Sequence, residues 1–364
     1  MRERVLILGG AGNFGKRIAM ALTGADIPVI LAGRTEGKCL TLQNQLPTGM
    51  SEVACFDANQ ELDEQLSKLN PKLVINTCGP FQNSTYAIAE TCIHHKTHYI
   101  DLADGRDFVI GINRLDQAAK QARIAVISGA STVPGLSSAV IEYFKSEFSK
   151  FRSLRYGISP GQKAERGLAT TQGILSYVGQ KLNSFPGTGV AYGWQDVYRQ
   201  RYPELGNRWM ANCDIPDLDL FPARYGLQKI QFSAGLELSA LHLGLWGLSW
   251  LVRAGVPIRL TRYAPLLLQL SNLFDRLGSA DGGMHMTITG LDHAGKLMNL
   301  DWFMIAKDGD GPHIPTVPAI LLAKQIMRDE FKTLGAMACV GLVSLDDCLK
   351  ELSNRNIRTH IVRS

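Results

Sequence analysis

The chain has 364 residues, of which 45% are hydrophobic and 20% are charged, as is typical of a globular protein with two domains. Its net charge of +5 comes from scattered lysines and arginines, so the sequence carries no basic tract of the kind that binds nucleic acid. Its seven cysteines form no Cys-x-x-Cys pair, which favours reduced thiols in the cytoplasm. A strand that begins by Arg4 leaves no room for a signal peptide ahead of it, in agreement with that location.

A glycine-rich turn near the N-terminus joins an apolar strand at 5–8 to a helical pattern at 16–22. The turn contains Gly-x-Gly-x-x-Gly, in which the first glycine permits a tight turn, the second lets a pyrophosphate approach the backbone, and the third lets the helix pack close to the strand. The positive end of the helix faces the phosphates. The predicted cofactor contacts of this turn are Gly10, Gly12, Asn13, Phe14 and Gly15.

The residues that follow the second strand, which is expected at 27–31, indicate which dinucleotide the chain binds. An NAD-selective site places an acidic residue about twenty residues beyond the glycines. This chain has Gly33 at that place, and Arg34, Thr35 and Lys38 follow it. A guanidinium can hold a phosphate with paired charge-assisted hydrogen bonds, so we expect NADP(H) rather than NAD(H). The alternative is an exposed arginine at the start of a helix.

Strands and helices then alternate through residue 130, and the strands are nearly continuous apolar runs. This pattern predicts the α/β class, with a Rossmann-type, doubly wound parallel sheet of six strands. The next strands are expected at 53–56, 73–76, 98–102 and 124–128, and the helices at 37–45, 84–94 and 108–121. Ligands bind at the carboxyl ends of such strands. The cofactor site is therefore expected to include Asp57, Ala58, Cys78, Gly79, Pro80 and Phe81.

The pattern changes after residue 150, where helical segments alternate with Gly- and Pro-rich turns. Two alternating segments, at 284–289 and 297–305, predict antiparallel strands. We expect residues 1–134 with 315–364 to form the dinucleotide-binding domain. Residues 135–314 are expected to form an α+β domain that contains an antiparallel sheet and serves for substrate binding and dimerisation.

Two apolar segments, at 238–252 and 264–277, lie in this second domain. The first has fifteen residues, too few to span a bilayer comfortably. Arg253, Arg259 and Arg262 lie between the two segments. We expect both segments to be buried in the core or in a homodimer interface, and docking on a membrane surface is the alternative.

Three residues around the fifth strand, Tyr99, Asp101 and Asp104, are candidates for proton transfer. Asp101 could relay a proton or bind a ribose, or it could bond to the backbone amides of a loop. A metal site at His94, His95 and His98 would need the helix to continue through residue 97, where the pattern predicts a strand, and we expect no metal. Candidates for substrate binding in the second domain, which the sequence does not rank, are Lys163, Arg166, Tyr192 and His285.

Five segments, in this order, resemble the saccharopine dehydrogenase-like family. They are ILGGAGNFG, LVINTCGPF, THYIDLADG, PGLSS, and the tail GDGPHIPTVPAILLAKQI with GAMACVGLVSLDD. The resemblance implies a Rossmann domain that binds NADP(H) and a second domain that closes the site and often dimerises. It also implies hydride transfer to or from a C=N, C=O or enoyl group of a small substrate. The alternatives are a non-catalytic nucleotide sensor or scaffold and a membrane-docked reductase of an acyl or lipid substrate.

Overall fold

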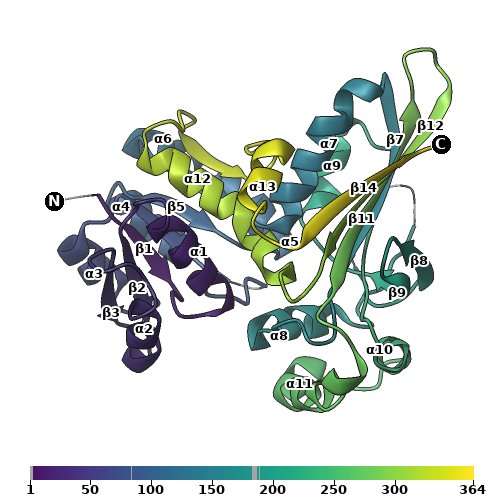
Figure 1. Ribbon diagram of the computed structural model, residues 1–364, viewed down its shortest axis with the longest axis horizontal. Helices are drawn as coiled ribbons and strands as arrows, with labels where there is room; N and C mark the ends of the chain where they lie inside the picture. The colour runs from purple at the N-terminus through teal and green to yellow at the C-terminus, as the bar shows by residue number, and fades with distance from the viewer. Residues whose placement is uncertain (1–2, 83, 183–186, 188) are drawn as a thin grey trace. The chain divides into compact units, whose positions relative to one another are not determined.

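A computed structural model describes residues 3–82, 84–182, 187 and 189–364. The chain divides into two compact units, Met1–Ile141 with His313–Glu351 and Glu142–Pro312 with Leu352–Ser364. Each unit contains its own seven-stranded sheet (Figure 1).

The first unit is built on a parallel sheet with the strand order β13-β6-β5-β4-β1-β2-β3. Its central strands are four-residue runs, apolar except for Asn76 and buried on both faces, as a parallel sheet covered by helices requires. The strands are β1 (Val5–Leu8), β2 (Val29–Gly33), β3 (Ser51–Cys55), β4 (Leu73–Asn76), β5 (His98–Asp101), β6 (Ala125–Ser128) and β13 (Gly335–Ala338). The α-helices are α1 (Asn13–Thr23), α2 (Glu36–Gln43), α3 (Leu62–Leu69), α4 (Ala87–His94), α5 (Arg106–Gly111), α6 (Asp116–Ala122), α7 (Ser137–Phe144), α12 (Val317–Met327) and α13 (Leu345–Glu351).

The predicted α/β class and doubly wound order are confirmed, and two details differ from the prediction. The helix expected at 108–121 is three pieces, α5, a 3-10 turn at Ile112–Leu115, and α6. It changes geometry after Gly111, where a Cβ atom would lie 2.2 Å from the Tyr86 hydroxyl oxygen. The sheet also has a seventh strand, β13, which comes from the C-terminal segment and pairs with β6.

The second unit contains a mixed sheet with the order β14-β12-β11-β7-β10-β9-β8. The two antiparallel strands expected from the sequence are present as β11 and β12. The pair β7–β10 is parallel, because a long connection with α8, β8, β9 and α9 returns the chain to the end of the sheet at which β7 begins. The strands are β7 (Lys150–Ser159), β8 (Tyr198–Tyr202), β9 (Gly206–Asn212), β10 (Lys229–Ala234), β11 (Gly282–Leu291), β12 (Leu297–Ala306) and β14 (Ile357–Arg363). The α-helices are α8 (Leu168–Tyr177), α9 (Asp217–Tyr225), α10 (Ser239–Arg253) and α11 (Ala264–Asn272).

The end of the chain differs from the predicted domain boundaries of 1–134 with 315–364 and 135–314. Residues 313–351 lie in the first unit, but β14 pairs antiparallel with β12 in the second. β14 thereby covers an edge that β12 would otherwise expose, which is the physical reason that these residues lie with the second unit.

The apolar segments at 238–252 and 264–277 form α10, α11 and a final 3-10 turn, Asp275–Leu277. One side of each helix packs on a core cluster that includes Trp194 and Leu260. On the other side of each helix the core alternative of the prediction is wrong, because Leu273 is 74% exposed and Leu277 is 72% exposed in the single chain. Apolar residues occupy both sides of α10, so the sequence pattern did not distinguish them. A dimer interface at this surface stays a prediction.

Candidate cofactor-binding site

A cavity of about 650 Å³ lies at the carboxyl ends of β1 to β4 in the first unit. This is where an open parallel sheet with reversed strand order binds ligands. Its lining is Leu8, Gly9, Ala11, Gly12, Ala32, Gly33, Arg34, Thr35, Lys38, Cys39, Phe56, Asp57, Ala58, Asn59, Asn76, Cys78, Gly79, Pro80, Phe81, Ser84, Thr85, Ala87, Ile88, Tyr99 and Phe108.

Ten of the predicted cofactor residues line this cavity, and four do not. Those that line it are Gly12, Arg34, Thr35, Lys38, Asp57, Ala58, Cys78, Gly79, Pro80 and Phe81. Gly10, Asn13, Phe14 and Gly15 are not among the described lining residues. The sequence did not indicate the contributions from the start of α4 or from Ala11, because they depend on how the loops fold over the strand ends.

The glycines of the first turn have roles that differ partly from the prediction. The positive φ, +73°, belongs to Gly9 rather than to Gly10. A Cβ atom at Gly10 would lie 3.0 Å from the Cα atom of Leu31 on β2, so Gly10 is required for close packing. At Gly15 a Cβ atom would lie 2.2 Å from the carbonyl oxygen of Gly9, which fits the predicted close approach of helix and strand. Gly12 lines the cavity at the N-cap of α1.

The end of β2 presents three side chains that suit a phosphate. Arg34, Thr35 and Lys38 line the cavity and are exposed. Among the described residues, no carboxylate forms an ion pair with Arg34 or Lys38, so both charges are available. Thr35 is the N-cap of α2, and its hydroxyl makes no capping hydrogen bond. A Cβ atom at Gly33 would meet only the Sγ atom of Cys39, at 3.4 Å, so the backbone leaves room for the acidic residue that this chain lacks.

A hydrogen-bonded chain crosses from β5 to the loop after β4. The amide nitrogen of Asn76 donates to the Tyr99 hydroxyl at 3.2 Å, and the backbone amide of Cys78 donates to the Asn76 side-chain oxygen at 3.0 Å. Tyr99 lines the cavity but is nearly fully buried. Its position therefore supports the loop of Cys78 to Phe81 from beneath.

Asp101 and Asp104 lie outside the described cavity lining. Asp101 is fully buried, and its Oδ1 atom accepts hydrogen bonds from the Ala103 amide, the Ser128 hydroxyl and the Gly129 amide at 3.0, 2.9 and 2.8 Å. This geometry agrees with the alternative in which the Asp101 carboxylate accepts hydrogen bonds from backbone amides of a loop instead of relaying a proton or binding a ribose. Asp104 is exposed and accepts a hydrogen bond from Gln82 at 3.1 Å.

The three histidines considered for a metal are separated by the end of a helix. His94 is the last residue of α4, whereas His98 begins β5 and accepts a hydrogen bond from the Ala125 amide at 3.0 Å. His94 and His95 instead meet Asp63 on α3, and the potential ligand atoms of these three residues lie within 4.8 Å of one another. The Nε2 atom of His95 and an Asp63 carboxylate oxygen are 2.8 Å apart, so a protonated His95 Nε2 donates a hydrogen bond to Asp63.

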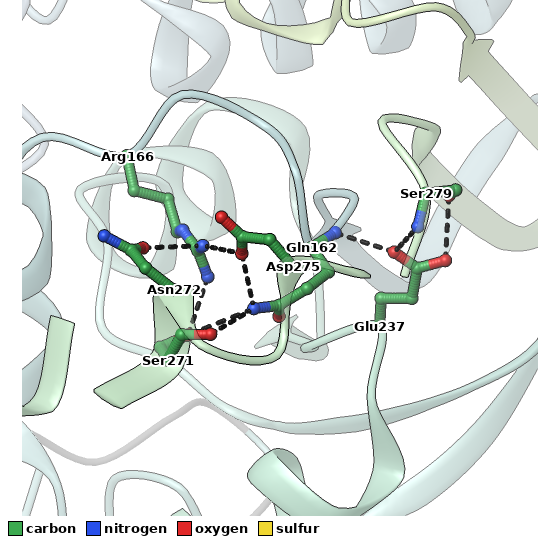
Figure 2. Close-up of polar contacts among 7 residues, drawn as sticks. All are labelled: Gln162, Arg166, Glu237, Ser271, Asn272, Asp275 and Ser279. Atoms are coloured by element: carbon green, nitrogen blue, oxygen red, sulfur yellow. Dashed lines mark hydrogen bonds and ion pairs between the residues drawn. The ribbon is translucent and has the colours of Figure 1, made fainter. Parts of the chain in front are cut away.

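The substrate candidates of the second unit are held by neighbours of their own. Arg166 forms an ion pair with Asp275 at 2.6 Å and donates to Ser271 (Figure 2). His285 is buried against the Tyr202 hydroxyl at 2.8 Å, and burial lowers its pKa from 6.5 to about 3. Arg253 lies over the ring of Tyr192, 4.0 Å from its centroid. Arg166 and His285 therefore serve the packing of the second unit.

Comparison with known proteins identifies the first unit. Residues 5–127 match the saccharopine dehydrogenase NADP binding domain. This match makes the nucleotide-binding part of the chain similar to the saccharopine dehydrogenase-like family. No curated protein matches the chain.

Solved structures extend the similarity to the whole fold. Saccharopine dehydrogenase (L-Glu forming) from Saccharomyces cerevisiae aligns with a TM-score of 0.68 at 14% identity, over 99% of this chain and 100% of that one. Amine dehydrogenase from Mycobacterium smegmatis aligns with a TM-score of 0.49 at 11% identity, over 93% and 95% of the two chains. The first match shows a shared fold, and the second is too distant to add to the argument. The family match supports the predicted dehydrogenase or reductase.

Proposed function

We propose that the chain is an NADP(H)-dependent oxidoreductase that transfers a hydride to or from a C=N, C=O or enoyl group of a small substrate. The observation that carries the cofactor preference is the end of β2, where Gly33 replaces an acidic residue and Arg34, Thr35 and Lys38 line the cavity. A 2′-phosphate at this point would meet two cations and a hydroxyl rather than a repelling carboxylate.

The residues present fit a dinucleotide in three respects. Gly12 leaves space at the N-terminus of α1, where a Cβ atom would lie 3.0 Å from the Gly9 carbonyl oxygen. The N-terminal end of that helix favours the negative charge of a pyrophosphate. The loop of Cys78 to Phe81 forms a further part of the cavity lining, backed by Asn76 and Tyr99. When bound, the nicotinamide supplies or accepts the hydride, and these residues bind and orient the cofactor.

A non-catalytic nucleotide sensor remains the second candidate, because the described cavity lining contains no histidine and Asp57 as its one carboxylate. Consumption of NADPH in the presence of imine, ketone and enoyl compounds distinguishes an enzyme from a sensor. Cytoplasmic location and a homodimer remain predictions of the sequence.

Titration of both nucleotides tests the cofactor proposal. We expect Arg34→Ala to weaken NADPH binding by about ten- to a hundred-and-fifty-fold, which corresponds to about 1.5 to 3 kcal/mol for a hydrogen bond to a charged group. NADH binding should change far less, because NADH has no 2′-phosphate. Arg328→Ala is the matched control, since Arg328 is exposed in the same unit and lies outside the cavity lining. Equal affinity of the parent protein for NADPH and NADH would defeat the assignment.

A further inference from the structure

The outer sides of α10 and α11 form an exposed apolar surface in the second unit. On α11 and the turn after it, exposed side chains recur every three or four residues, as one side of a helix requires. On α10 the exposed side carries Leu243, Trp250 and Leu251. We call this set the leucine face; its exposed members are Leu243, Trp250, Leu251, Val256, Tyr263, Leu266, Leu270, Leu273, Phe274 and Leu277. So many large exposed apolar side chains indicate a surface with a partner.

A polar network fixes the orientation of this surface. The Gln162 side-chain amide donates to the Ser271 carbonyl oxygen at 2.8 Å and to Asp275 Oδ1 at 3.0 Å, and the Arg166 guanidinium donates to the same Asp275 oxygen (Figure 2). Ser271 and Asp275 are four residues apart and lie on the inner side of the α11 segment. The leucines on the opposite side therefore point into solvent.

The same network reaches the beginning of α10. Glu237, two residues before that helix, accepts hydrogen bonds from the Gln162 amide at 2.7 Å and from the Ser279 amide at 2.9 Å (Figure 2). Arg208 adds an ion pair to Glu237 at 3.2 Å. Both apolar helices are thus attached to the sheet by buried or half-buried polar contacts, and the exposed face is a fixed feature of the fold.

The charges within the segment that carries the leucine face, residues 238–277, are almost all positive. Residues 238–277 contain four arginines, Arg253, Arg259, Arg262 and Arg276, and a single acid, Asp275. Asp275 is neutralised by Arg166. All four arginines are exposed, and among the described residues none of them has an acidic ion-pair partner.

We propose that the leucine face docks the protein on an anionic membrane surface. Exposed leucines beside arginines match an interface in which acyl chains meet negative headgroups. Trp250 and Tyr263 are of the residue types that concentrate at this boundary. A second copy of the chain on this face would bring four more arginines and one more acid to the interface, which is electrostatically unfavourable. Within the described residues, no helix is both long and apolar enough to cross a membrane, so the contact is peripheral.

Vesicle sedimentation of the full chain tests this proposal. We expect the parent protein to bind phosphatidylcholine vesicles that contain phosphatidylglycerol and to bind pure phosphatidylcholine vesicles less. The double variant Leu273→Glu with Leu277→Glu should lose about tenfold or more of this binding. Both positions are more than two-thirds exposed, so folding should be unaffected. Arg259→Gln with Arg262→Gln should lower binding to the anionic vesicles by about 25-fold, if each arginine contributes about a factor of five.

The matched control is Leu297→Glu with Val362→Glu, which adds the same charge at residues that are 52% exposed on the sheet of the same unit. This variant should bind vesicles like the parent apart from a small general effect of charge. The proposal is overturned if the parent does not bind anionic vesicles, or if the test and control variants bind equally. It is also overturned if the parent is a dimer that Leu273→Glu with Leu277→Glu dissociates without any vesicle binding.

Discussion

Replacing Asp101 by Asn should change how the stability of the first unit depends on pH. The carboxylate is fully buried, and one oxygen accepts three hydrogen bonds from the chain. An asparagine oxygen can accept the same three bonds and stays neutral at every pH. The substitution therefore removes the charge while it keeps the contacts.

Burial raises the pKa of Asp101 from 3.8 to about 6, although the hydrogen bonds from Gly129, Ala103 and Ser128 oppose the shift. Between these two values the native state holds a proton that the unfolded chain has released. The stability that this group contributes is therefore complete below its unfolded pKa and is lost as the pH rises through its folded pKa. At about 1.4 kcal/mol per pKa unit, the loss is on the order of 3 kcal/mol.

Unfolding in urea at several pH values measures this effect. All five tryptophans lie in the second unit, so tryptophan fluorescence follows that unit, whereas circular dichroism follows both. In the circular dichroism transition, the stability of Asp101→Asn relative to the parent should rise by about 3 kcal/mol between about pH 3 and pH 7. The fluorescence transition serves as the internal control. A stability difference that does not vary with pH would refute the assigned burial of this charge.

Other substitutions test the remaining features. Gly15→Ala should destabilise the first unit by about 1 to 3 kcal/mol or more, because its Cβ atom would press on the Gly9 carbonyl oxygen, whereas Gly37→Ala, with no atom within 4 Å of the added carbon, should not. Gly33→Asp should lower NADPH affinity by about tenfold or more and raise NADH affinity, and parallel losses for both nucleotides would contradict the role given to this position. Burial lowers the pKa of His242 from 6.5 to about 4. The stability that this group contributes is therefore complete above pH 6.5 and is lost as the pH falls toward about 4. In the His242→Phe variant, the free energy of unfolding followed by fluorescence should no longer fall by about 3 kcal/mol on acidification. An unchanged dependence on acid pH would contradict this role of His242.

The sequence predicted the first sheet well because buried parallel strands are short apolar runs with little ambiguity. It missed α3, although Leu62, Leu66 and Leu69 have helical spacing, because the segment is otherwise polar. It also missed β13, whose sequence Gly-Ala-Met-Ala has little strand preference and is placed by pairing with β6. In both cases tertiary contacts decided the structure.

The candidate site divides in the same way. Arg34, Thr35 and Lys38 were predictable because they adjoin one strand end, and local order along the chain brings them together. Asn76 and Tyr99 could not be linked from the sequence, because their contact depends on the pairing of β4 with β5. The outer side of α10 and α11 could not be assigned either, since apolar residues on both sides leave the buried side undefined.

The proton-transfer candidates show why cofactor binding was easier to predict than chemistry. The Tyr99 hydroxyl lies at the cavity wall, and burial raises its pKa well above 10, so at neutral pH it has a proton to donate and does not act as a base. Its hydrogen bond with Asn76 makes it a positioning residue for the loop that begins at Cys78. Asp101 faces backbone amides rather than the cavity. The described cavity thus offers groups that bind and orient a nucleotide and few that exchange a proton. The cofactor carries the hydride, so the protein has to supply only a proton donor placed beside the substrate. Such a donor is defined by its position in the folded site and not by a sequence motif, so the local sequence does not reveal it.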